Sequence, residues 1–252
     1  MLASRHRVLH FERIDSTNAE ALRLSGTGEQ GPLWILADEQ TGGRGRLGRS
    51  WVSEPGNLYA TFLFTTSAGA EAAAQISFVA ALAVRDTVAG MLPGRSVAIK
   101  WPNDVLVDGA KICGILVEVA ANSPTVLALG CGLNVAHSPD NTSYPVTSLA
   151  RGGAEAKVSG AFHALDRSLS HHLAIWNDGA GFGRIRQLWE QHAIGLGEAV
   201  TVQSGSEHIT GIFRSLAPDG ALILSLANGT LKTIHAGDVR FAAVEALRQR
   251  HP

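Results

Sequence analysis

The sequence feature that most constrains the fold is a two-residue turn, Asp108-Gly109, which lies between two apolar runs. An Asp-Gly pair in this position predicts a β-hairpin, because it is one of the pairs that two-residue hairpin turns favour. Apolar runs at 97–102 and 125–135 predict further strands beside the hairpin. Apolar residues at helical spacing predict helices before and after these strands, at 71–91, 159–177 and 182–193.

The N-terminal part of the chain adds more strands and one short helix. A helix is expected within 15–26, with a capping box formed by Thr17 and Glu20 and an end at Gly26. Strands are expected at 7–14, 33–40 and 57–66. Together these elements predict an α+β fold in which helices flank a mixed β-sheet.

The pattern of expected secondary structure changes after Gly195. Four or five short strands follow, separated by Ser-Gly, Pro-Asp-Gly and Asn-Gly turns. This spacing predicts a small SH3-like β-barrel behind the main domain. The chain is therefore expected to comprise a catalytic domain at 1–195 and a C-terminal domain at 196–252.

Composition indicates a soluble globular protein without a broad basic surface. The chain has 252 residues, 45% of them hydrophobic and 17% charged, and a net charge of −1. A dedicated nucleic-acid-binding protein would carry a clear basic excess, so no nucleic-acid partner is expected. The apolar stretch 71–92 is interrupted by polar and charged residues, so no membrane span is expected there. These residues are Gln75, Ser77, Arg85 and Asp86.

The cysteines and histidines show no pattern of catalysis or metal binding. Cys113 and Cys131 lie in apolar runs without a Cys-x-x-Cys motif or a signal peptide, which favours buried free thiols and a cytoplasmic location. The ten histidines form no H-x-x-x-H pair with a nearby carboxylate on an expected helix, so no fixed metal site is predicted. His171-His172 is expected on a solvated helix face.

The stretch TGGRGRLGRSW at 41–51 contains a G-x-G-x-x-G pattern but lacks the context of a dinucleotide-binding turn. Pro55, Gly56 and then a strand follow it, so no helix N-terminus could face a pyrophosphate. The VAIK sequence at 97–100 resembles a protein-kinase motif, yet the His-Arg-Asp, Asp-Phe-Gly and Ala-Pro-Glu motifs are absent from the sequence. An RNA site would require interleaved aromatic residues, and only Trp51 is close.

The arginines of this stretch indicate a different role. Arg44, Arg46 and Arg49 place three planar guanidinium donors, matched to carboxylate or phosphate, on a loop whose glycines permit close backbone approach. We therefore interpret it as a flap that an anionic ligand orders, and we expect it to be poorly ordered without ligand.

A second segment with candidate ligand-binding residues, 100–118, also points to an anionic ligand. Asn103 and Asp104 supply an amide and a carboxylate that suit a nucleotide and a hard cation such as Mg²⁺. Lys111 lies in an otherwise apolar strand, where an unpaired ammonium is costly. It therefore needs an anionic partner, for which a ligand is the simplest candidate; a lysine snorkelling from an edge strand is the alternative.

Six strings of this sequence occur in the order and spacing of biotin protein ligases, also called biotin–[acetyl-CoA-carboxylase] ligases. They are DSTN, EQTGGRGRLGRSW, GNLYATFLF, KWPNDV, KICGILVE and GCGLNV. The chain resembles this family strongly over about residues 10–135 and weakly in the DGALIL and HAGDVRF tail. The resemblance implies the biotin/lipoate ligase fold, which is similar to class II aminoacyl-tRNA synthetases.

The resemblance also implies site residues. It assigns catalytic roles to Arg46 and Lys111, beside the biotin carboxylate and the α-phosphate. The implied biotin-binding residues are Ser16, Thr17, Asn18, Gln40, Gly43, Arg44, Gly45, Arg46, Tyr59, Lys111, Gly114, Ile115, Gly130 and Gly132. The implied ATP- and adenylate-binding residues are Arg46, Arg49, Trp51, Asn103, Asp104, Lys111, Asn134 and Arg240. Magnesium would arrive with the ATP phosphates and could also reach Asp104.

The activity implied by the resemblance has two steps, with ATP converted to AMP and diphosphate. Biotin is activated to biotinyl-5′-AMP and then transferred to one lysine of a biotin carboxyl carrier protein, of acetyl-CoA carboxylase or a related carboxylase. The sequence leaves no room before the first strand for a winged helix-turn-helix, which favours the form without operator binding, as a monomer or homodimer. A lipoate or octanoate ligase and a non-enzymatic biotin sensor or scaffold are the alternatives.

Overall fold

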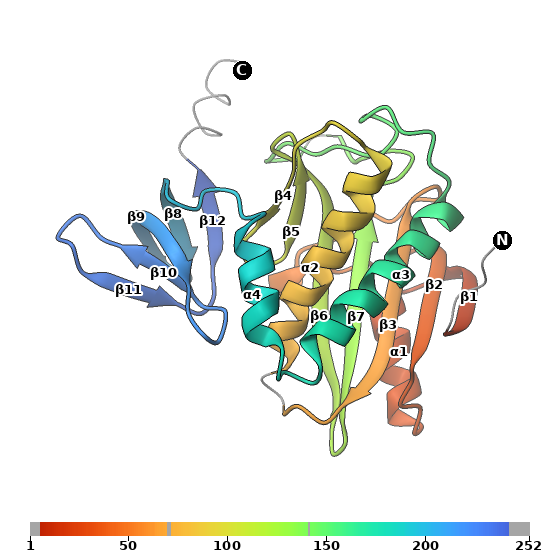
Figure 1. Cartoon of the computed structure of the whole chain (residues 1–252). Helices are drawn as coiled ribbons and strands as arrows, with labels where there is room; N and C mark the ends of the chain where they lie inside the picture. The colour runs from red at the N-terminus through yellow and green to blue at the C-terminus, as the bar shows by residue number, and fades with distance from the viewer. Residues whose placement is uncertain (1–5, 70–71, 141, 242–252) are drawn as a thin grey trace.

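The computed structural model describes residues 6–69, 72–140 and 142–241, which form two β-sheets and flanking helices (Figure 1). In the larger sheet the strand order is β1-β2-β3-β7-β6-β5-β4. Only β1 and β2 pair in parallel, and every other neighbouring pair is antiparallel, so the predicted mixed sheet is confirmed. The strands are β1 Arg7–Ile14, β2 Leu33–Gln40, β3 Leu58–Thr66, β4 Val97–Lys100, β5 Asp104–Val107, β6 Ala110–Asn122 and β7 Thr125–Leu133.

The predicted hairpin joins β5 and β6 at the expected turn. Val107 pairs with Ala110, and the two residues between them have positive φ angles, 48° at Asp108 and 82° at Gly109. A type I′ turn requires this conformation at both central residues, and Asp-Gly supplies it at little steric cost.

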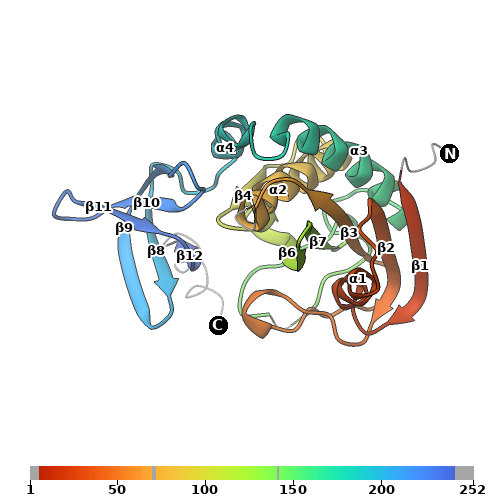
Figure 2. The same ribbon diagram turned by 90° about the horizontal axis from the view of Figure 1, so that it is seen from below.

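Helices cover both faces of the larger sheet. Two helices pack on one face, α2 Ala72–Met91 and α3 Val158–Trp176, and α4 Phe182–Glu190 packs against both of them. The shorter α1, Thr17–Gly26, lies on the opposite face, as the view along the sheet in Figure 2 shows. Its Ala21 packs against Leu33, Ile35 and Leu63. Space for a ligand therefore lies beside α1, since the other face is filled by α2 and α3.

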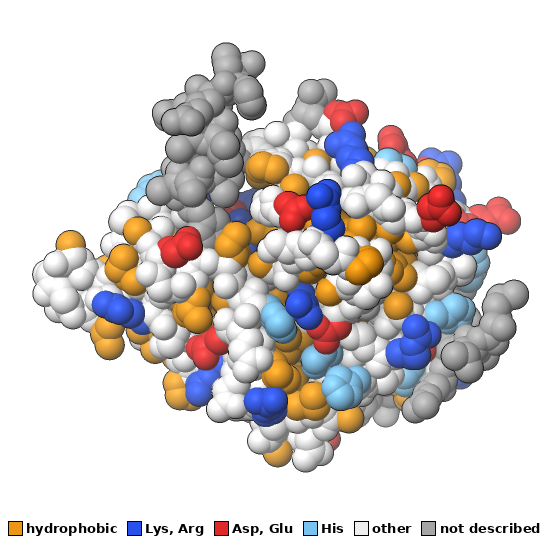
Figure 3. All heavy atoms as spheres, turned by 45° about the horizontal axis from the view of Figure 1, so that its top comes forward, with side chains coloured by type: hydrophobic (Ala, Val, Ile, Leu, Met, Phe, Trp, Pro, Cys, Tyr) orange, Lys and Arg blue, Asp and Glu red, His pale blue; other side chains and the backbone are white. Residues whose placement is uncertain are grey.

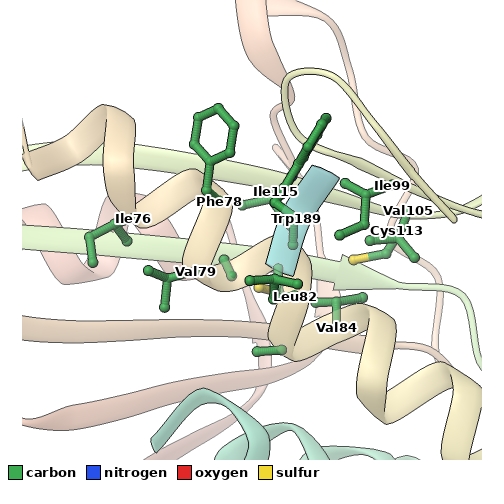
Figure 4. Packing of buried hydrophobic residues seen from close by; sticks show 14 of the residues in the cluster. Ile76, Phe78, Val79, Leu82, Val84, Ile99, Val105, Cys113, Ile115 and Trp189 are labelled. Atoms are coloured by element: carbon green, nitrogen blue, oxygen red, sulfur yellow. The ribbon is translucent and has the colours of Figure 1, made fainter. Parts of the chain in front are cut away.

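The main hydrophobic core forms around α2 (Figure 4). Ile76, Val79 and Leu82 are almost fully buried against the sheet and the neighbouring helices. This helix is long and apolar enough to cross a membrane, yet it is the central core helix of the fold. Cys113 and Cys131 are buried free thiols, as predicted, and burial raises the pKa of both.

The N-terminus of α1 differs from the predicted capping box. Ser16 is the N-cap residue, and its side chain accepts a hydrogen bond from the N–H of Ala19. Thr17 is instead the first helical residue, and both its N–H and its hydroxyl donate to Oε1 of Gln40. The cap prediction was therefore wrong by one residue, because Thr17 is held by the neighbouring strand β2.

The histidine pair on α3 also differs from expectation. His171 is exposed, but His172 is buried, and its Nε2 lies 2.8 Å from Oδ2 of Asp86 on α2. The solvated-face prediction therefore fails for His172, because a carboxylate on the facing helix gives the ring a polar partner.

The C-terminal residues form a five-stranded antiparallel sheet in the order β11-β10-β9-β8-β12. The strands are β8 Ala199–Ser204, β9 Glu207–Leu216, β10 Leu222–Ser225, β11 Leu231–Ile234 and β12 Asp238–Phe241. Within residues 195–241 the sheet remains open, since its edge strands β11 and β12 are not paired with each other. The SH3-like spacing of strands is thus present without a closed barrel, and the boundary at 195/196 stays a prediction.

The C-terminal sheet packs directly on the main fold (Figure 1). Nε1 of Trp101 donates to the carbonyl of Gly220 over 3.1 Å. A side chain at Gly220 would collide with Phe78 and Phe182, so glycine permits this close approach. The start of β12 lies near the turn between β4 and β5, where Lys100 pairs with Asp238.

Candidate active site

A pocket lies on the α1 face of the larger sheet, and glycines form its floor. Gly114 of β6 is paired with Gly132 of β7, and Gly130 is paired with Leu116. A Cβ atom at Gly130 would lie 2.2 Å from Oδ1 of Asn18, and one at Gly132 would lie 2.4 Å from Nε1 of Trp51. The floor must therefore be glycine for other groups to approach the strands.

Most of the residues expected from the sequence line this one pocket. They are Ser16, Thr17, Asn18, Gln40, Arg44, Gly45, Arg46, Arg49, Trp51, Asn103, Asp104, Lys111, Gly114, Ile115, Gly130 and Gly132. They come from the start of α1, the end of β2, the glycine-arginine loop and the strands β5, β6 and β7, which the sheet topology brings together.

Four expected residues do not line the pocket. Gly43 packs under the carbonyl of Trp51, and the hydroxyl of buried Tyr59 donates to the carbonyl of Glu54. The side-chain amide of Asn134 donates to the carbonyl of Thr147, and Arg240 donates to Oε1 of Gln203. These contacts shape the surroundings of the pocket, so any direct ligand role for the four residues stays a prediction.

The pocket also contains residues that the sequence reasoning missed: Leu47, Ser50, Leu116, Cys131, Tyr144, Gly237 and Asp238. The first four fall inside the quoted motifs, so their position in the sequence could have identified them. Tyr144 lies outside every motif, and Asp238 lies in the weakly similar tail. Only the packing of distant segments brings these two to the site.

Lys111 has an anionic partner within the protein itself. Its Nζ lies 2.7 Å from Oδ1 of Asp104, so the expected anionic partner is a side chain and need not be a ligand. Burial alone would lower the pKa of Lys111, but the charge and hydrogen bond of Asp104 outweigh it, so the pKa is raised. The ammonium also lies over the rings of Trp51 and Tyr144, at 5.4 and 5.5 Å from the ring centroids. Lys111 is therefore a positioned, charged group.

Each arginine of the glycine-arginine loop contacts a different part of the fold. Nη1 of Arg46 donates to Oδ1 of Asn103 over 3.2 Å, and burial lowers the pKa of this half-buried guanidinium. Asn103 in turn donates from Nδ2 to the carbonyl of Ile115, which fixes its oxygen toward the arginine. Arg44 contacts Glu118 on β6, and Arg49 contacts Asp238 on β12. The loop thus lies across the pocket.

Trp51 covers the glycine floor in this arrangement. Its indole lies against Gly114 and Gly132, and its Nε1 is buried without a hydrogen-bond partner among the described residues. A ligand that lies along the two glycines would have to displace the indole.

Asp238 joins the C-terminal sheet to both the loop and the larger sheet. One carboxylate oxygen lies 3.0 Å from Nζ of Lys100, and the other lies 3.2 Å from Nη1 of Arg49. Burial alone would raise the pKa of Asp238, but Lys100 and Arg49 lower it below its usual 3.8.

We expect the Asp238→Asn substitution to lower the free energy of unfolding by about 1 kcal/mol at pH 7, as for a partly exposed ion-pair network. Because the folded pKa is depressed, this contribution is present above the unfolded pKa and is lost as the pH falls through the folded value. Chemical denaturation of both proteins at pH 7 and below pH 3.8 measures the difference. An equal difference in the free energy of unfolding between the two proteins at both pH values would contradict this role of the charge.

The described residues contain no group of three or more His, Cys, Asp or Glu side chains able to hold a metal ion. Asp104 is the carboxylate nearest to Lys111, and it also lies 3.9 Å from Nζ of Lys100.

Comparison with known proteins assigns the chain to a family of ligases. Residues 10–134 match the Biotin/lipoate A/B protein ligase family, and residues 195–241 match the Biotin protein ligase C terminal domain. A biotin–[acetyl-CoA-carboxylase] ligase of Paracoccus denitrificans is 42% identical over 241 residues, which cover 91% of this chain and 98% of that protein. The chain belongs to the biotin protein ligase family.

Further relatives support the assignment. The biotin–[acetyl-CoA-carboxylase] ligase of Mycobacterium tuberculosis is 32% identical, and the match covers 89% of this chain and 85% of that protein. The fold is similar to the structure of the Aquifex aeolicus biotin protein ligase in complex with biotin and ATP, with a TM-score of 0.78 and 27% identity. That match covers 93% of this chain and 97% of the other.

Proposed function

We propose that this protein uses ATP to attach biotin to a lysine of a carrier protein. In the first step, an oxygen of the biotin carboxylate attacks the α-phosphorus of ATP, the bond to the β-phosphate breaks, and diphosphate leaves. In the second step, the amine of the carrier lysine attacks the carbonyl carbon of biotinyl-5′-AMP, AMP leaves, and the amine loses a proton.

Lys111 and Arg46 are the proposed catalytic residues. Both line the same pocket, and each carries a positive charge that can contact the carboxylate and phosphate oxygens. The reaction gathers negative charge at the α-phosphate, so fixed cations in a site with little water stabilise its transition state. Asp104 holds Lys111 until these oxygens arrive.

The proposed substrate contacts divide between the two ends of the pocket. The bicyclic end of biotin would lie beside the start of α1, where Ser16, Thr17 and Asn18 line the pocket above the glycine floor. ATP would lie near Asn103, Arg49 and the displaced indole of Trp51, with Mg²⁺ neutralising part of its phosphate charge.

The observation that carries the proposal is the convergence of Arg46 and Lys111 with the glycine floor in one pocket. Incubation with biotin, Mg-ATP and a biotin carboxyl carrier domain tests it: the carrier should gain the mass of one biotinyl group, at one lysine. Lipoate and octanoate, offered in the same assay, should leave the carrier unmodified. Transfer of either acid in preference to biotin, or binding without diphosphate release, would overturn the proposal.

We further propose the acceptor to be the biotin carboxyl carrier protein of acetyl-CoA carboxylase or a related carboxylase, with the reaction in the cytoplasm. The net charge of −1 leaves no basic excess, and basic and acidic side chains are interspersed on the face in Figure 3; together these support a protein that does not bind operator DNA. We propose a monomer or a homodimer.

The glycine-arginine loop offers a direct test of ligand binding. The side chains of Arg44 and Arg49 are about half or more exposed, so trypsin should cut the ligand-free protein within 44–49. Saturating biotin and ATP should slow this cleavage at least about tenfold, because a ligand that binds one conformation suppresses the open one. Mass spectrometry of timed digests measures the rates. Equal rates with and without ligands would contradict loop closure.

A further inference from the structure

Glu118 lies behind the pocket, where β6 meets the start of α1. Its Oε2 accepts a hydrogen bond of 2.7 Å from Nδ2 of Asn18, and its Oε1 lies 3.5 Å from Nη2 of Arg44. Only about a quarter of its side chain is exposed. Glu118 does not itself line the pocket, so it acts on a ligand only through Asn18 and Arg44.

Glu118 and the carbonyl of Leu116 together set which way the amide of Asn18 points. An ionised carboxylate can only accept hydrogen bonds, so the NH₂ group of Asn18 has to face it. The same NH₂ group also donates to the carbonyl of Leu116. Both amide hydrogens are therefore used inside the protein, and Oδ1 is directed to the other side.

Oδ1 of Asn18 lies against Gly130 of the pocket floor and accepts a hydrogen bond from the hydroxyl of Thr61. A carbonyl oxygen has a second lone pair, so it can still accept a hydrogen from a ligand. The pocket therefore presents an acceptor at this point, and a ligand group that fits it is a hydrogen-bond donor, such as the N–H of a ureido group.

Polar contacts link this amide to the glycine-arginine loop. Oγ1 of Thr61 lies 2.8 Å from Oγ1 of Thr17, and Oγ1 of Thr17 lies 3.0 Å from Oε1 of Gln40. The amide of Gln40 donates to Ser53, and Ser53 donates to the carbonyl of Trp51. The carboxylate is thus the anionic end of a series of polar contacts that extends to the glycine-arginine loop.

We propose that Glu118 is a positioning residue that fixes the acceptor face of Asn18 toward the pocket and thereby selects a ligand with ureido N–H groups. This inference rests on the proposed function, because it concerns how the same pocket recognises biotin. It assigns Glu118 to the biotin end of the pocket and not to the ATP end.

Titration calorimetry with biotin alone, together with the KM for ATP in adenylate formation, tests the proposal. Glu118→Ala should weaken biotin binding about tenfold, the equivalent of one hydrogen bond to a charged group, and leave the KM for ATP within about twofold. The biotin affinity of Glu118→Gln should lie between that of Glu118→Ala and that of the unsubstituted protein. The glutamine oxygen can still accept a hydrogen bond from Asn18, but the glutamine side chain also carries an NH₂ group, so it no longer requires the NH₂ group of Asn18 to face it.

A double-mutant cycle separates positioning from a general structural effect. If Glu118 acts on biotin through Asn18, the Asn18→Ala/Glu118→Ala protein should bind biotin about as weakly as Asn18→Ala alone. Glu155→Ala, a substitution of an exposed glutamate away from the pocket, is the matched control and should change neither quantity.

Two results would overturn the inference while leaving the proposed function intact. One is unchanged biotin binding by Glu118→Ala, and the other is an equal loss of affinity for biotin and for ATP in a protein that still unfolds cooperatively. Absence of biotin binding and of adenylate formation in the unsubstituted protein would instead refute the proposed function, and with it the role of Glu118.

Discussion

Lys111→Ala is expected to lower the rate of biotinyl-adenylate formation by at least about a hundredfold, as loss of a charge-stabilising group in an active site does. Asp104 and the rings of Trp51 and Tyr144 hold the ammonium in the pocket, so it is positioned before the ligand binds. Arg46→Ala should have an effect of similar size. Diphosphate release and retention of labelled adenylate by the purified proteins measure both.

The controls for this prediction address folding and charge. Lys157→Ala removes an exposed lysine at the start of α3 and should leave adenylate formation unchanged. Lys111→Ala leaves Asp104 without its closest partner, so circular dichroism and thermal unfolding must confirm that the fold persists. A folded Lys111→Ala protein with an unchanged adenylate yield would refute the catalytic assignment.

Gly130→Ala is expected to weaken biotin binding by about a hundredfold. The new Cβ would lie 2.2 Å from Oδ1 and 2.9 Å from Cγ of Asn18, so the asparagine has to leave its position. A hundredfold loss corresponds to about 2.7 kcal/mol of binding free energy, which we attribute to the displaced Asn18 acceptor and to the methyl group on the pocket floor. Titration calorimetry with biotin measures the loss.

Gly160→Ala is the matched control for this substitution. Gly160 lies in α3, and a Cβ there would meet nothing within 4 Å. Since alanine is the better helix former, this protein should be as active as the unsubstituted one and slightly more stable. Normal biotin affinity in Gly130→Ala would show that Asn18 can move without loss, which would contradict a fixed binding contact at this residue.

The sequence by itself was sufficient for most of the secondary structure, because the periodicity of apolar residues and the turn residues act locally. The Asp108-Gly109 hairpin and the buried strand β7 can each be predicted from a short stretch of sequence. The cap of α1 did not, since Gln40, a residue from another strand, competes for Thr17. His172 was misplaced for the same reason, because its partner Asp86 lies on another helix.

Motif spacing also identified most residues of the pocket, including both proposed catalytic cations. What it could not provide were the partners of those residues. The contact of Arg49 with Asp238 and the link from Glu118 to Asn18 join residues whose separation in the chain carries no signal of contact. The hairpin brings Lys111 and Asp104 to neighbouring strands, but only the structure shows that their charged groups meet.

The sequence determined the chemical groups of this site: a glycine floor, three loop arginines and a lysine in an apolar strand. Tertiary structure decided the pKa values and the orientations of the side chains around it. Burial and neighbouring charges set the pKa of Lys111 and Asp238, and a carboxylate on β6 sets the direction in which Asn18 faces. These properties depend on distances between atoms of distant segments, and such distances exist only once the sheet has formed and the two β-units have packed together.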